Sequence, residues 1–280
     1  MQLSFQDRTY LITGGGSGIG KGVAAGLVSA GASVMIVGRN PDRLAGAVEE
    51  IAPLADRAGN GGAIRYEPTD VTNEDEVVRA VDAATAWHGR LHGAVHCAGG
   101  SLTVGPITHT DSEAWRNTVD LNVNGTMYVL KHVGRELVRG GGGSFIGISS
   151  IAASNTHRWF GPYGVTKSAI DHMMMLAADE LGESWVRVNS IRPGLIRTDL
   201  VDASVIQSPE ISADYAQCTP LPRVGEVEDV ANLAMFLLSD AAGGTGQCIN
   251  VDGGHMLRRG PDYSSMMVRM FGQDALRGVV

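Results

Sequence analysis

The sequence predicts an α/β protein, built as a single doubly wound domain with about seven parallel strands and helices on both faces. Two observations predict this class. Short β-rich runs alternate with longer amphipathic stretches about six times along the chain. The short runs are almost entirely apolar, which is typical of parallel strands that helices cover on both faces. The 280 residues are enough to bury one sizeable core, and no linker or internal repeat interrupts them.

The strands are expected where apolar and β-branched residues gather between turn-forming residues. The predicted ranges are 9–13, 32–37, 63–67, 93–97, 144–149, 186–191 and 247–251. Each is short enough for a strand and is followed by a longer stretch with helical periodicity.

The helices between them are indicated by start signals and by spacing. Asn40 followed by Pro41 gives an N-cap and then a proline at the first helical position. Asn73 precedes three acidic residues, which suit the positive end of a helix dipole. Apolar residues repeat at helical spacing in two further stretches. They are Val77, Val81 and Ala84 in one, and Val230, Leu233, Ala234 and Leu237 in the other.

Two regions depart from the alternation. Residues 198–222 form a long, irregular stretch, which indicates a functional lid over a substrate or a disordered loop. Residues 255–280 follow the last strand as a C-terminal extension rich in Arg and Met. Three interpretations of the extension stay open: packing on a neighbouring subunit, capping of a pocket, or a frayed terminus.

Composition excludes several classes of function. A formal net charge of −8 argues against nucleic-acid binding. The eight histidines show no metal-ligand spacing, so no metal is expected. The three cysteines, Cys97, Cys218 and Cys248, are far apart and are expected to be reduced thiols. Without a signal-peptide pattern or a long apolar run, the protein is expected to be cytoplasmic and not bound to a membrane.

A glycine-rich turn lies between the first predicted strand and the first predicted helix. The strand runs directly into TGGGSGIG at residues 13–20, in which Gly14, Gly18 and Gly20 are the spaced glycines. Backbone without side chains lets a pyrophosphate approach the helix N-terminus, where unpaired N–H groups favour anions. The alternatives are a tight strand-to-helix turn and a methyltransferase-type nucleotide loop.

The ends of the second and third strands carry the residues expected to choose the dinucleotide. At the second, Gly38 occupies the place where a carboxylate would bind the ribose of NAD, and Arg39 follows it. A guanidinium binds a 2′-phosphate, so NADP(H) is the preferred cofactor and NAD(H) a possible one. The alternative is a solvated surface arginine. At the third, Asp70 and Val71 would hold the adenine, unless Asp70 is only a helix cap.

A tyrosine and a lysine stand four residues apart, on one face of a predicted helix. They are Tyr163 and Lys167, in a chain that has six tyrosines and three lysines, so chance seldom produces the pair. Ser150 closes the fifth strand, and Asn122 lies in an apparent helix before it. The alternatives are a surface helix pair, a strand-end cap at Ser150, and Asn124 in place of Asn122.

Taken together, these motifs resemble those of the short-chain dehydrogenase/reductase family, over residues 6–254. The resemblance rests on TGGGSGIG, Asp70-Val71, CAGG at 97–100, LNVNG at 121–125, Ser150, Tyr163, Lys167, Pro193-Gly194 with Thr198, and VDGG at 251–254. It implies a single Rossmann domain over residues 1–254 that binds a dinucleotide and carries out catalysis. The activity it implies is hydride transfer between a nicotinamide and a substrate.

The resemblance also implies roles for individual residues. Tyr163 would exchange a proton with the substrate oxygen, because a neighbouring ammonium on Lys167 and a positive nicotinamide both favour its phenolate. Ser150 would hydrogen-bond the same oxygen, and Asn122 would position a water that connects Lys167 to solvent. The implied cofactor-binding residues are Gly14, Gly16, Ser17, Gly18, Ile19, Gly20, Arg39, Asn40, Asp70, Val71, Cys97, Ala98, Gly99, Tyr163, Lys167, Pro193, Gly194, Ile196 and Thr198.

One position departs from the family pattern. The family usually shows Asn-Ala-Gly after the fourth strand, whereas this chain has Cys97-Ala98-Gly99. Because the side-chain amide is missing, this strand end is expected to be less rigid. Cys97 is not expected to act as a nucleophile, since no activating base lies near it in the sequence.

The substrate is expected to be a small, partly apolar molecule. Trp159 lies between Ser150 and Tyr163, where it would enclose an apolar substrate, while Arg158 would meet an anionic group or stay solvated. The lid stretch adds Leu200, Val201, Ile206 and Tyr215. Carbonyl–alcohol interconversion is the leading function. Reduction of an enoyl thioester and nucleotide sensing without turnover are the alternatives.

Family members usually form homodimers or homotetramers through the helices that carry the asparagine and the tyrosine. The same assembly is therefore implied for this chain. An apolar stripe on the second of these helices is compatible with such an interface. It consists of Ile170, Met173, Met174, Ala177 and Leu181.

Overall fold

The computed structural model describes residues 5–59, 61–101, 103–198, 209–258 and 262–278. Within this part of the chain, seven parallel strands form one sheet in the order β3-β2-β1-β4-β5-β6-β7. The strands are β1 Thr9–Thr13, β2 Ser33–Gly38, β3 Ala63–Pro68, β4 Gly93–His96, β5 Gly143–Ile148, β6 Val186–Pro193 and β7 Cys248–Val251. The predicted fold class is confirmed, and each strand lies within two residues of its predicted range.

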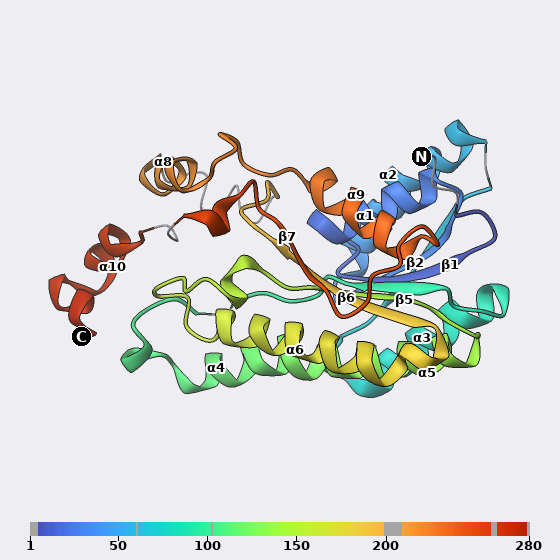
Figure 1. Cartoon of the computed structure of the whole chain (residues 1–280), viewed down its shortest axis with the longest axis horizontal. Helices are drawn as coiled ribbons and strands as arrows, with labels where there is room; N and C mark the ends of the chain where they lie inside the picture. Colours follow the sequence, from blue (N-terminus) through green and yellow to red (C-terminus); the bar gives the residue numbers. More distant parts are fainter. Residues whose placement is uncertain (1–4, 60, 102, 199–208, 259–261, 279–280) are drawn as a thin grey trace.

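Helices cover both faces of the sheet, as Figure 1 shows. On one face lie α1 (Gly18–Ser29), α2 (Pro41–Ala58) and α9 (Val227–Leu238). On the other lie α3 (Glu74–His88), α4 (Ser112–Val119), α5 (Gly125–Arg139) and α6 (Tyr163–Leu181). Two further helices, α8 (Pro209–Cys218) and α10 (Ser264–Phe271), lie beyond one end of the sheet (Figure 1).

The predicted helix starts are present as capping interactions. The Asn40 side chain accepts a hydrogen bond from the Arg43 N–H at 3.0 Å and so begins α2. The Asn73 side chain accepts from the N–H groups of Asp75 and Glu76 and begins α3. Each cap satisfies backbone donors that the first helical turn leaves without partners.

The sheet separates two apolar cores, one under each helical layer. Val23, Leu27 and Leu237 are fully or almost fully buried on the α1–α9 face, as are Phe145 and Met174 on the α5–α6 face. The prediction that all strands are covered holds only for the inner ones. On the edge strand β3, helices do not cover every residue, and residues 65 and 66 are exposed. An edge strand has a neighbour on one side only, which is why it carries polar residues.

The strand order places a crevice at the carboxyl ends of β1 and β4. The chain winds from β1 outward through β2 to β3 and then returns to add β4 on the other side of β1. Connections leaving these two strands diverge to opposite faces, and ligands of doubly wound sheets bind at this point. Both the glycine-rich turn and the CAGG segment begin there.

The stretch predicted to be irregular contains a helix, α8. Of the apolar residues named for the lid, Tyr215 lies on α8 and is buried. The others, Leu200, Val201 and Ile206, lie outside the described residues. Helix formation here was missed because Pro, Ser and Asp at the start of α8 are typical of loops as well as of first helical turns.

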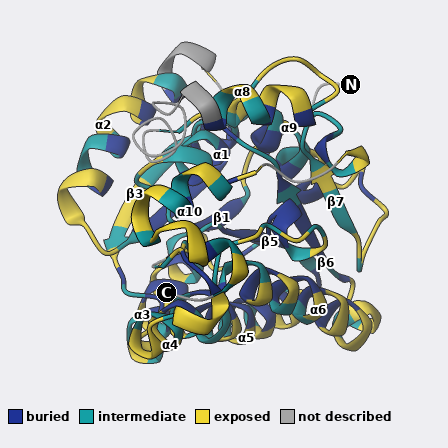
Figure 2. Cartoon of the chain, turned by 90° about the vertical axis from the view of Figure 1, so that its left-hand side faces the viewer, coloured by how far each residue is buried: buried dark blue, intermediate teal, exposed yellow. Residues whose placement is uncertain are grey.

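The described part of the C-terminal extension folds onto its own chain. Tyr263, Met267 and Ala275 are almost fully buried, and the Thr108 hydroxyl donates a hydrogen bond to the Gly278 carbonyl at 2.5 Å. Figure 2, which looks onto this end of the molecule, shows α10 in front of the strands, with its outer side exposed. The described residues 262–278 are therefore folded against the chain rather than frayed.

Candidate active site

The glycine-rich turn brings bare backbone close to neighbouring main chain. Gly14 and Gly18 have φ angles of 65° and 50°, which residues with a side chain rarely adopt. A Cβ placed on Gly20 would lie 2.4 Å from the Gly14 carbonyl oxygen. Sequence reasoning missed Gly15, where a Cβ would lie 2.5 Å from the Ile36 Cβ on β2. The packing of the turn onto β2 is the reason for this additional glycine.

Two arginines flank the glycine-rich turn at the end of β2. Arg39 is exposed and follows Gly38, as predicted. The oxygen of Asn40 is engaged in capping α2, which directs the chain so that Arg43 lies against the turn. A Cβ on Gly16 would be 3.4 Å from the Arg43 Cβ. Arg43 was not singled out from the sequence. It lies in the first turn of α2, where its N–H donates to the Asn40 cap.

The end of β3 is shaped by a local turn. One carboxylate oxygen of Asp70 accepts hydrogen bonds from the N–H and the hydroxyl of Thr72, at 3.0 and 2.8 Å. The Asp70 N–H in turn donates to Glu76 at 2.7 Å. Val71 is buried and packs beside Gly125 of α5. The cap of α3 is Asn73, so the alternative of a helix-capping aspartate is wrong, and Asp70 instead stabilises the turn before the helix through Thr72.

The end of β4 is anchored to β1 by hydrogen bonds although the side-chain amide is missing, and its lower rigidity stays a prediction. The Thr13 hydroxyl accepts hydrogen bonds from the N–H groups of Cys97 and Ala98, both at 3.1 Å. It also contacts Nδ1 of the buried His96 at 2.9 Å. Thr13 on β1 therefore replaces the anchoring that an asparagine would supply. Burial raises the pKa of the Cys97 thiol to about 12, so this thiol is not a thiolate near neutral pH.

Lys167 is a buried lysine. Its side chain is 4% exposed, and its Nζ donates a hydrogen bond to the Ile148 carbonyl at 2.8 Å. The same Nζ lies 5.6 Å from the centroid of the Tyr163 ring. Burial lowers the pKa of Lys167 to about 8. The alternative of a solvated surface pair is excluded by this burial.

Tyr163 begins α6 next to the end of β5, where Ser150 is located. Burial raises the pKa of Tyr163, and a hydrogen bond with Ser150 acts in the opposite direction. The expected lowering of this pKa is therefore not produced by the protein chain alone, because desolvation of the phenolate outweighs the hydrogen bond with Ser150. The Ser150 oxygen also accepts from the Ala152 N–H at 3.1 Å, so this residue caps the strand end as well.

Asn122 lies in a turn of π-helix, Asp120–Asn124, between α4 and α5. Its amide is fully buried, accepts from the Gly100 N–H at 2.9 Å and donates to the Gly100 carbonyl at 2.8 Å. It also donates to the Thr166 hydroxyl at 2.9 Å, one residue before Lys167. Asn124, the alternative, bonds instead to Asp120 of its own turn. The geometry therefore favours Asn122.

The segment after β6 reaches back to the glycine-rich turn. Gly194 donates its N–H to the Val251 carbonyl at 2.9 Å, and a Cβ there would lie 2.9 Å from the Asp252 Cα. Ile196 is buried, and Thr198 places its methyl group 3.2 Å from where a Cβ on Gly18 would be. The predicted cofactor residues from both ends of the chain are thus brought to one crevice.

Trp159 has an unusual backbone near Tyr163. Its φ is 77°, rare for a bulky residue, and its carbonyl accepts from the Gly105 N–H at 2.7 Å. Its indole N–H is buried and has no hydrogen-bond partner among the described residues. The neighbouring Phe160 ring lies 6.2 Å from the Tyr163 ring. Arg158 stacks over the Trp159 ring at 4.4 Å and is exposed.

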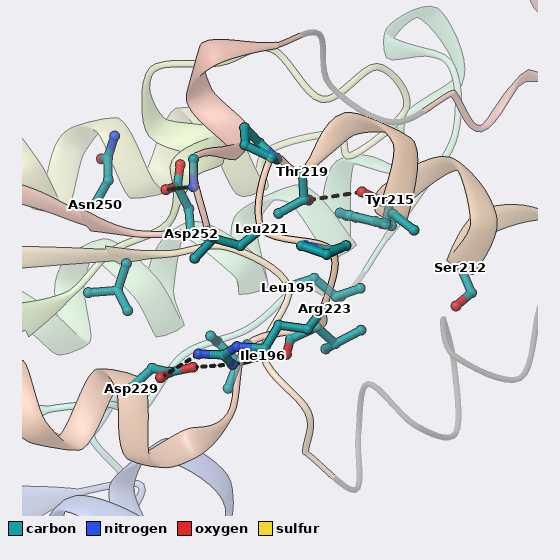
Figure 3. Close-up of a pocket in the computed structure, with 18 residues that line it drawn as sticks. Leu195, Ile196, Ser212, Tyr215, Thr219, Leu221, Arg223, Asp229, Asn250 and Asp252 are labelled. Atoms are coloured by element: carbon teal, nitrogen blue, oxygen red, sulfur yellow. Dashed lines mark hydrogen bonds and ion pairs between the residues drawn. The ribbon is translucent and has the colours of Figure 1, made fainter.

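A cavity of about 730 Å³ lies behind the segment that follows β6 (Figure 3). Leu195 and Ile196 form one side, Tyr215 of α8 another, and the ion pair between Arg223 and Asp229 lies at its rim. None of the four predicted catalytic residues lines it. The cavity adjoins the crevice through Leu195 but is not where the chemistry is expected.

Among the described residues, neither a metal-binding group nor a membrane-spanning helix is present. Within them, no group of three or more His, Cys, Asp or Glu side chains is arranged to hold a metal ion. Over the same residues, no helix combines the length and the apolar character needed to cross a lipid bilayer.

Comparison with known proteins gives consistent results over nearly the whole chain. A family model described as enoyl-(acyl carrier protein) reductase matches residues 14–256. A solved short-chain type dehydrogenase/reductase from Mycobacterium ulcerans is 80% identical, with a TM-score of 0.96, covering 99% of this chain and 100% of that one. The 7alpha-hydroxysteroid dehydrogenase of Escherichia coli is 36% identical, covering 90% of this chain and 95% of the relative.

Two further similar proteins extend this range. A 7 alpha-hydroxysteroid dehydrogenase solved with NADH and 7-oxo glycochenodeoxycholic acid is 35% identical, with a TM-score of 0.83, covering 90% of this chain and 96% of that one. The cyclohexanol dehydrogenase of Acinetobacter is 32% identical, covering 91% of this chain and 97% of the relative.

The fold and the matched residues define a nicotinamide-dependent oxidoreductase with a Rossmann-type domain. The chain belongs to the short-chain dehydrogenase/reductase family. The resemblance seen in its motifs is confirmed, and with it the expectation that the protein is an enzyme that uses NAD(H) or NADP(H).

Proposed function

We propose that this enzyme interconverts a ketone and a secondary alcohol, with Tyr163 as the general acid and base. The observation that carries the proposal is a half-buried tyrosine whose ring lies 5.6 Å from the Nζ of a buried lysine, with Ser150 hydrogen-bonded to the tyrosine. The similar proteins named as hydroxysteroid and cyclohexanol dehydrogenases, whose names describe alcohol substrates, support it.

The crevice fits a dinucleotide because side chains are absent where its pyrophosphate would pass. A Cβ on Gly14 or Gly20 would collide with main chain, so the backbone there can approach a ligand closely. When bound, the nicotinamide supplies or accepts the hydride. Asp70 and Val71 would flank the adenine, and residues 97–99 and 193–198 would line the nicotinamide end.

The chain's own residues handle the proton. In the reducing direction the Tyr163 hydroxyl donates its proton to the substrate oxygen, and in the oxidising direction the phenolate removes it. Ser150 donates a hydrogen bond to the same oxygen and holds it near Tyr163. Because burial alone raises the pKa of Tyr163, positive charge beside it is needed for the phenolate. The ammonium of Lys167 supplies part of that charge from the protein.

Asn122 acts as a positioning residue. Its amide fixes Gly100 after β4 and Thr166 on α6, so it connects the two segments that meet at Lys167. In this arrangement Asn122 would hold the water that links Lys167 to solvent, as the family resemblance implies. Proton exchange with bulk water would then follow this route.

We infer a preference for NADP(H) over NAD(H). Gly38 at the end of β2 carries no carboxylate that could bind the ribose of NAD or repel the 2′-phosphate of NADP. The exposed Arg39 that follows it is available to the 2′-phosphate. Arg43, whose backbone and Cβ lie against the glycine-rich turn, is a second arginine near this strand end. Since one similar structure was solved with NADH, discrimination between the two dinucleotides is a property to be measured for this chain.

The description of the matching family model favours a second candidate, reduction of the C=C bond of an enoyl thioester. A panel assay distinguishes the candidates. NADPH and NADH absorbance would be followed with cyclic and open-chain ketones, sugars, and enoyl thioesters. We expect turnover with ketones and the reverse reaction with secondary alcohols. Turnover with enoyl thioesters alone supports the second candidate, and dinucleotide binding without any turnover supports a nucleotide sensor.

We also propose a homodimer or homotetramer located in the cytoplasm. Apolar side chains on the outer sides of α5 and α6 support the assembly: Met127, Val138 and Leu176 are 38%, 38% and 52% exposed. The predicted set of interface residues on α6 was partly wrong, because Ile170 and Met174 are buried in the core of their own chain. All three cysteines are free thiols, which suits a reducing compartment.

A further inference from the structure

Three aromatic rings connect the catalytic tyrosine to the C-terminal extension. The Phe160 ring lies 6.2 Å from the Tyr163 ring and 5.1 Å from the Tyr263 ring, nearly edge-on to the latter. The hydroxyls of Tyr263 and Tyr215 are 2.9 Å apart. Phe160, Tyr263 and Tyr215, here called the aromatic wall, therefore follow one another from Tyr163 to the extension and from there to α8.

The aromatic wall is apolar toward its surroundings. Tyr215 and Tyr263 are 7% and 3% exposed, and burial raises the pKa of both hydroxyls. Because the two hydroxyls bond to each other, they present ring faces rather than polar groups to a neighbour. Aliphatic side chains complete the cluster, from the segment after β6, from α8 and from α10. They are Leu195, Ile211 and Met266.

The extension is attached to both sides of the crevice. Next to Tyr263, the Asp262 N–H donates to the Asp214 carboxylate of α8 at 2.6 Å. At the far end, Thr108 donates to the Gly278 carbonyl, and the Phe271 ring lies 3.5 Å from where a Cβ on Gly105 would be. Figure 1 shows α8 and α10 beyond the same end of the sheet. Tyr263 is thus fixed in place by contacts on either side of it.

We propose that Tyr263 determines substrate size: the aromatic wall closes the substrate cleft from within the same chain and restricts the substrate to a compact, apolar cyclic ketone or alcohol of about one ring. This inference rests on the proposed carbonyl–alcohol function and names its substrate class. Removing the Tyr263 side chain leaves a space of about one aromatic ring, which a substrate with a second ring can occupy.

The test measures ketone binding separately from turnover. Full-length wild type, Tyr263→Ala, Tyr263→Leu and Tyr263→Phe would be titrated with cyclohexanone, 2-decalone and a four-ring ketosteroid in the presence of NADP⁺. Quenching of Trp159, which packs against the same cluster, reports binding, and Trp159→Phe identifies its signal. Tyr66→Ala, an exposed tyrosine on β3, is the matched control. kcat/KM for reduction of the same ketones is measured in parallel.

We expect wild type to bind cyclohexanone most tightly. In Tyr263→Ala the affinity for 2-decalone relative to cyclohexanone should rise by about ten- to a hundredfold, as expected for opening an apolar subsite, and Tyr263→Leu should give a smaller rise. Tyr263→Phe, which keeps the ring, and Tyr66→Ala should keep the wild-type ranking. Should Tyr263→Ala not fold, the same shift in Tyr263→Leu carries the result.

An unchanged ranking in folded Tyr263→Ala or Tyr263→Leu overturns the inference, and so does a wild type that binds none of the ketones. Failure of the proposed function gives a different result. In that case the ketones bind with a ranking that depends on Tyr263, yet none is reduced and no alcohol is oxidised.

Discussion

Lys167 lies in an environment that is unusual for a lysine. A lysine side chain is rarely this buried, and among the described residues its Nζ donates a hydrogen bond to the Ile148 carbonyl. The cost of burying the ammonium is the reason that its pKa is lowered to about 8.

This lowered pKa predicts a pH-dependent stability. Between about pH 8 and the unfolded value of 10.5 the unfolded chain binds more protons at this position than the folded chain, so stability rises with pH. The free energy of unfolding of wild type minus that of Lys167→Met should therefore increase in this window, by up to about 1.4 kcal/mol per pH unit. Denaturant titrations between pH 7 and 10 measure it. A difference that stays flat or falls would refute the burial of a charged lysine.

Arg39 is the second residue with a prediction of its own. If it binds the 2′-phosphate, Arg39→Ala should lower the preference for NADPH over NADH by about ten- to a hundredfold, the value of one charge-assisted contact. Steady-state kinetics with both dinucleotides measure the ratio. Arg79→Ala, an exposed arginine on α3, is the control. If the NADPH-to-NADH preference of Arg39→Ala is unchanged, Arg39 does not bind the 2′-phosphate and is a solvated surface arginine.

At the scale of elements, the glycine-rich turn and the π-helical turn have different origins in the sequence. The turn could be predicted from its spaced glycines, of which Gly14 and Gly20 lie close to neighbouring main chain. The π-helical turn at Asp120–Asn124 could not, since it depends on Asn122 bonding to Gly100 from a distant strand end. A long-range hydrogen bond leaves no periodic signal in the sequence.

A pair of glycine variants tests the turn. In Gly20→Ala the new Cβ meets the Gly14 carbonyl, which should destabilise the protein by about 1–3 kcal/mol and weaken dinucleotide binding. Gly46→Ala, in α2 with no atom within 4 Å of its new Cβ, should be more stable by about 0.5–1 kcal/mol. Thermal unfolding and dinucleotide titration distinguish them. Equal behaviour of the two variants would show that the turn tolerates a side chain.

Other elements show where prediction from the sequence ends. Inner strands such as β1 and β5 were placed within two residues because burial on both faces makes them continuous apolar runs. The docking of α10 and the aromatic wall were missed, because contacts between Tyr263 and Phe160 join residues about a hundred positions apart. The hydrogen bonds that anchor the β4 end were also missed, since Thr13 accepts them from another strand.

At the scale of the whole molecule, the outer sides of α5 and α6 are expected to meet a second copy of the chain. Leu176→Glu would place a charge in this interface and should reduce a tetramer to dimers, or a dimer to monomers, at micromolar concentration. Analytical ultracentrifugation measures the change. Tyr66→Glu, on the edge strand β3, is the control and should leave the assembly unchanged. A wild type that is already monomeric would contradict the proposed assembly.

The central claim joins all three scales: a half-buried phenol lies beside a buried ammonium, in a crevice that the strand order forms. Replacing Tyr163 by Phe removes only the hydroxyl, so it tests this claim most directly. With cyclohexanone and NADPH, kcat/KM should fall by about a thousandfold or more, within the range of general acid–base catalysis. The NADPH dissociation constant, measured by fluorescence on the same samples, should change by less than about threefold, since no cofactor contact of the ring is lost. A variant that keeps a tenth or more of wild-type kcat/KM would contradict the account.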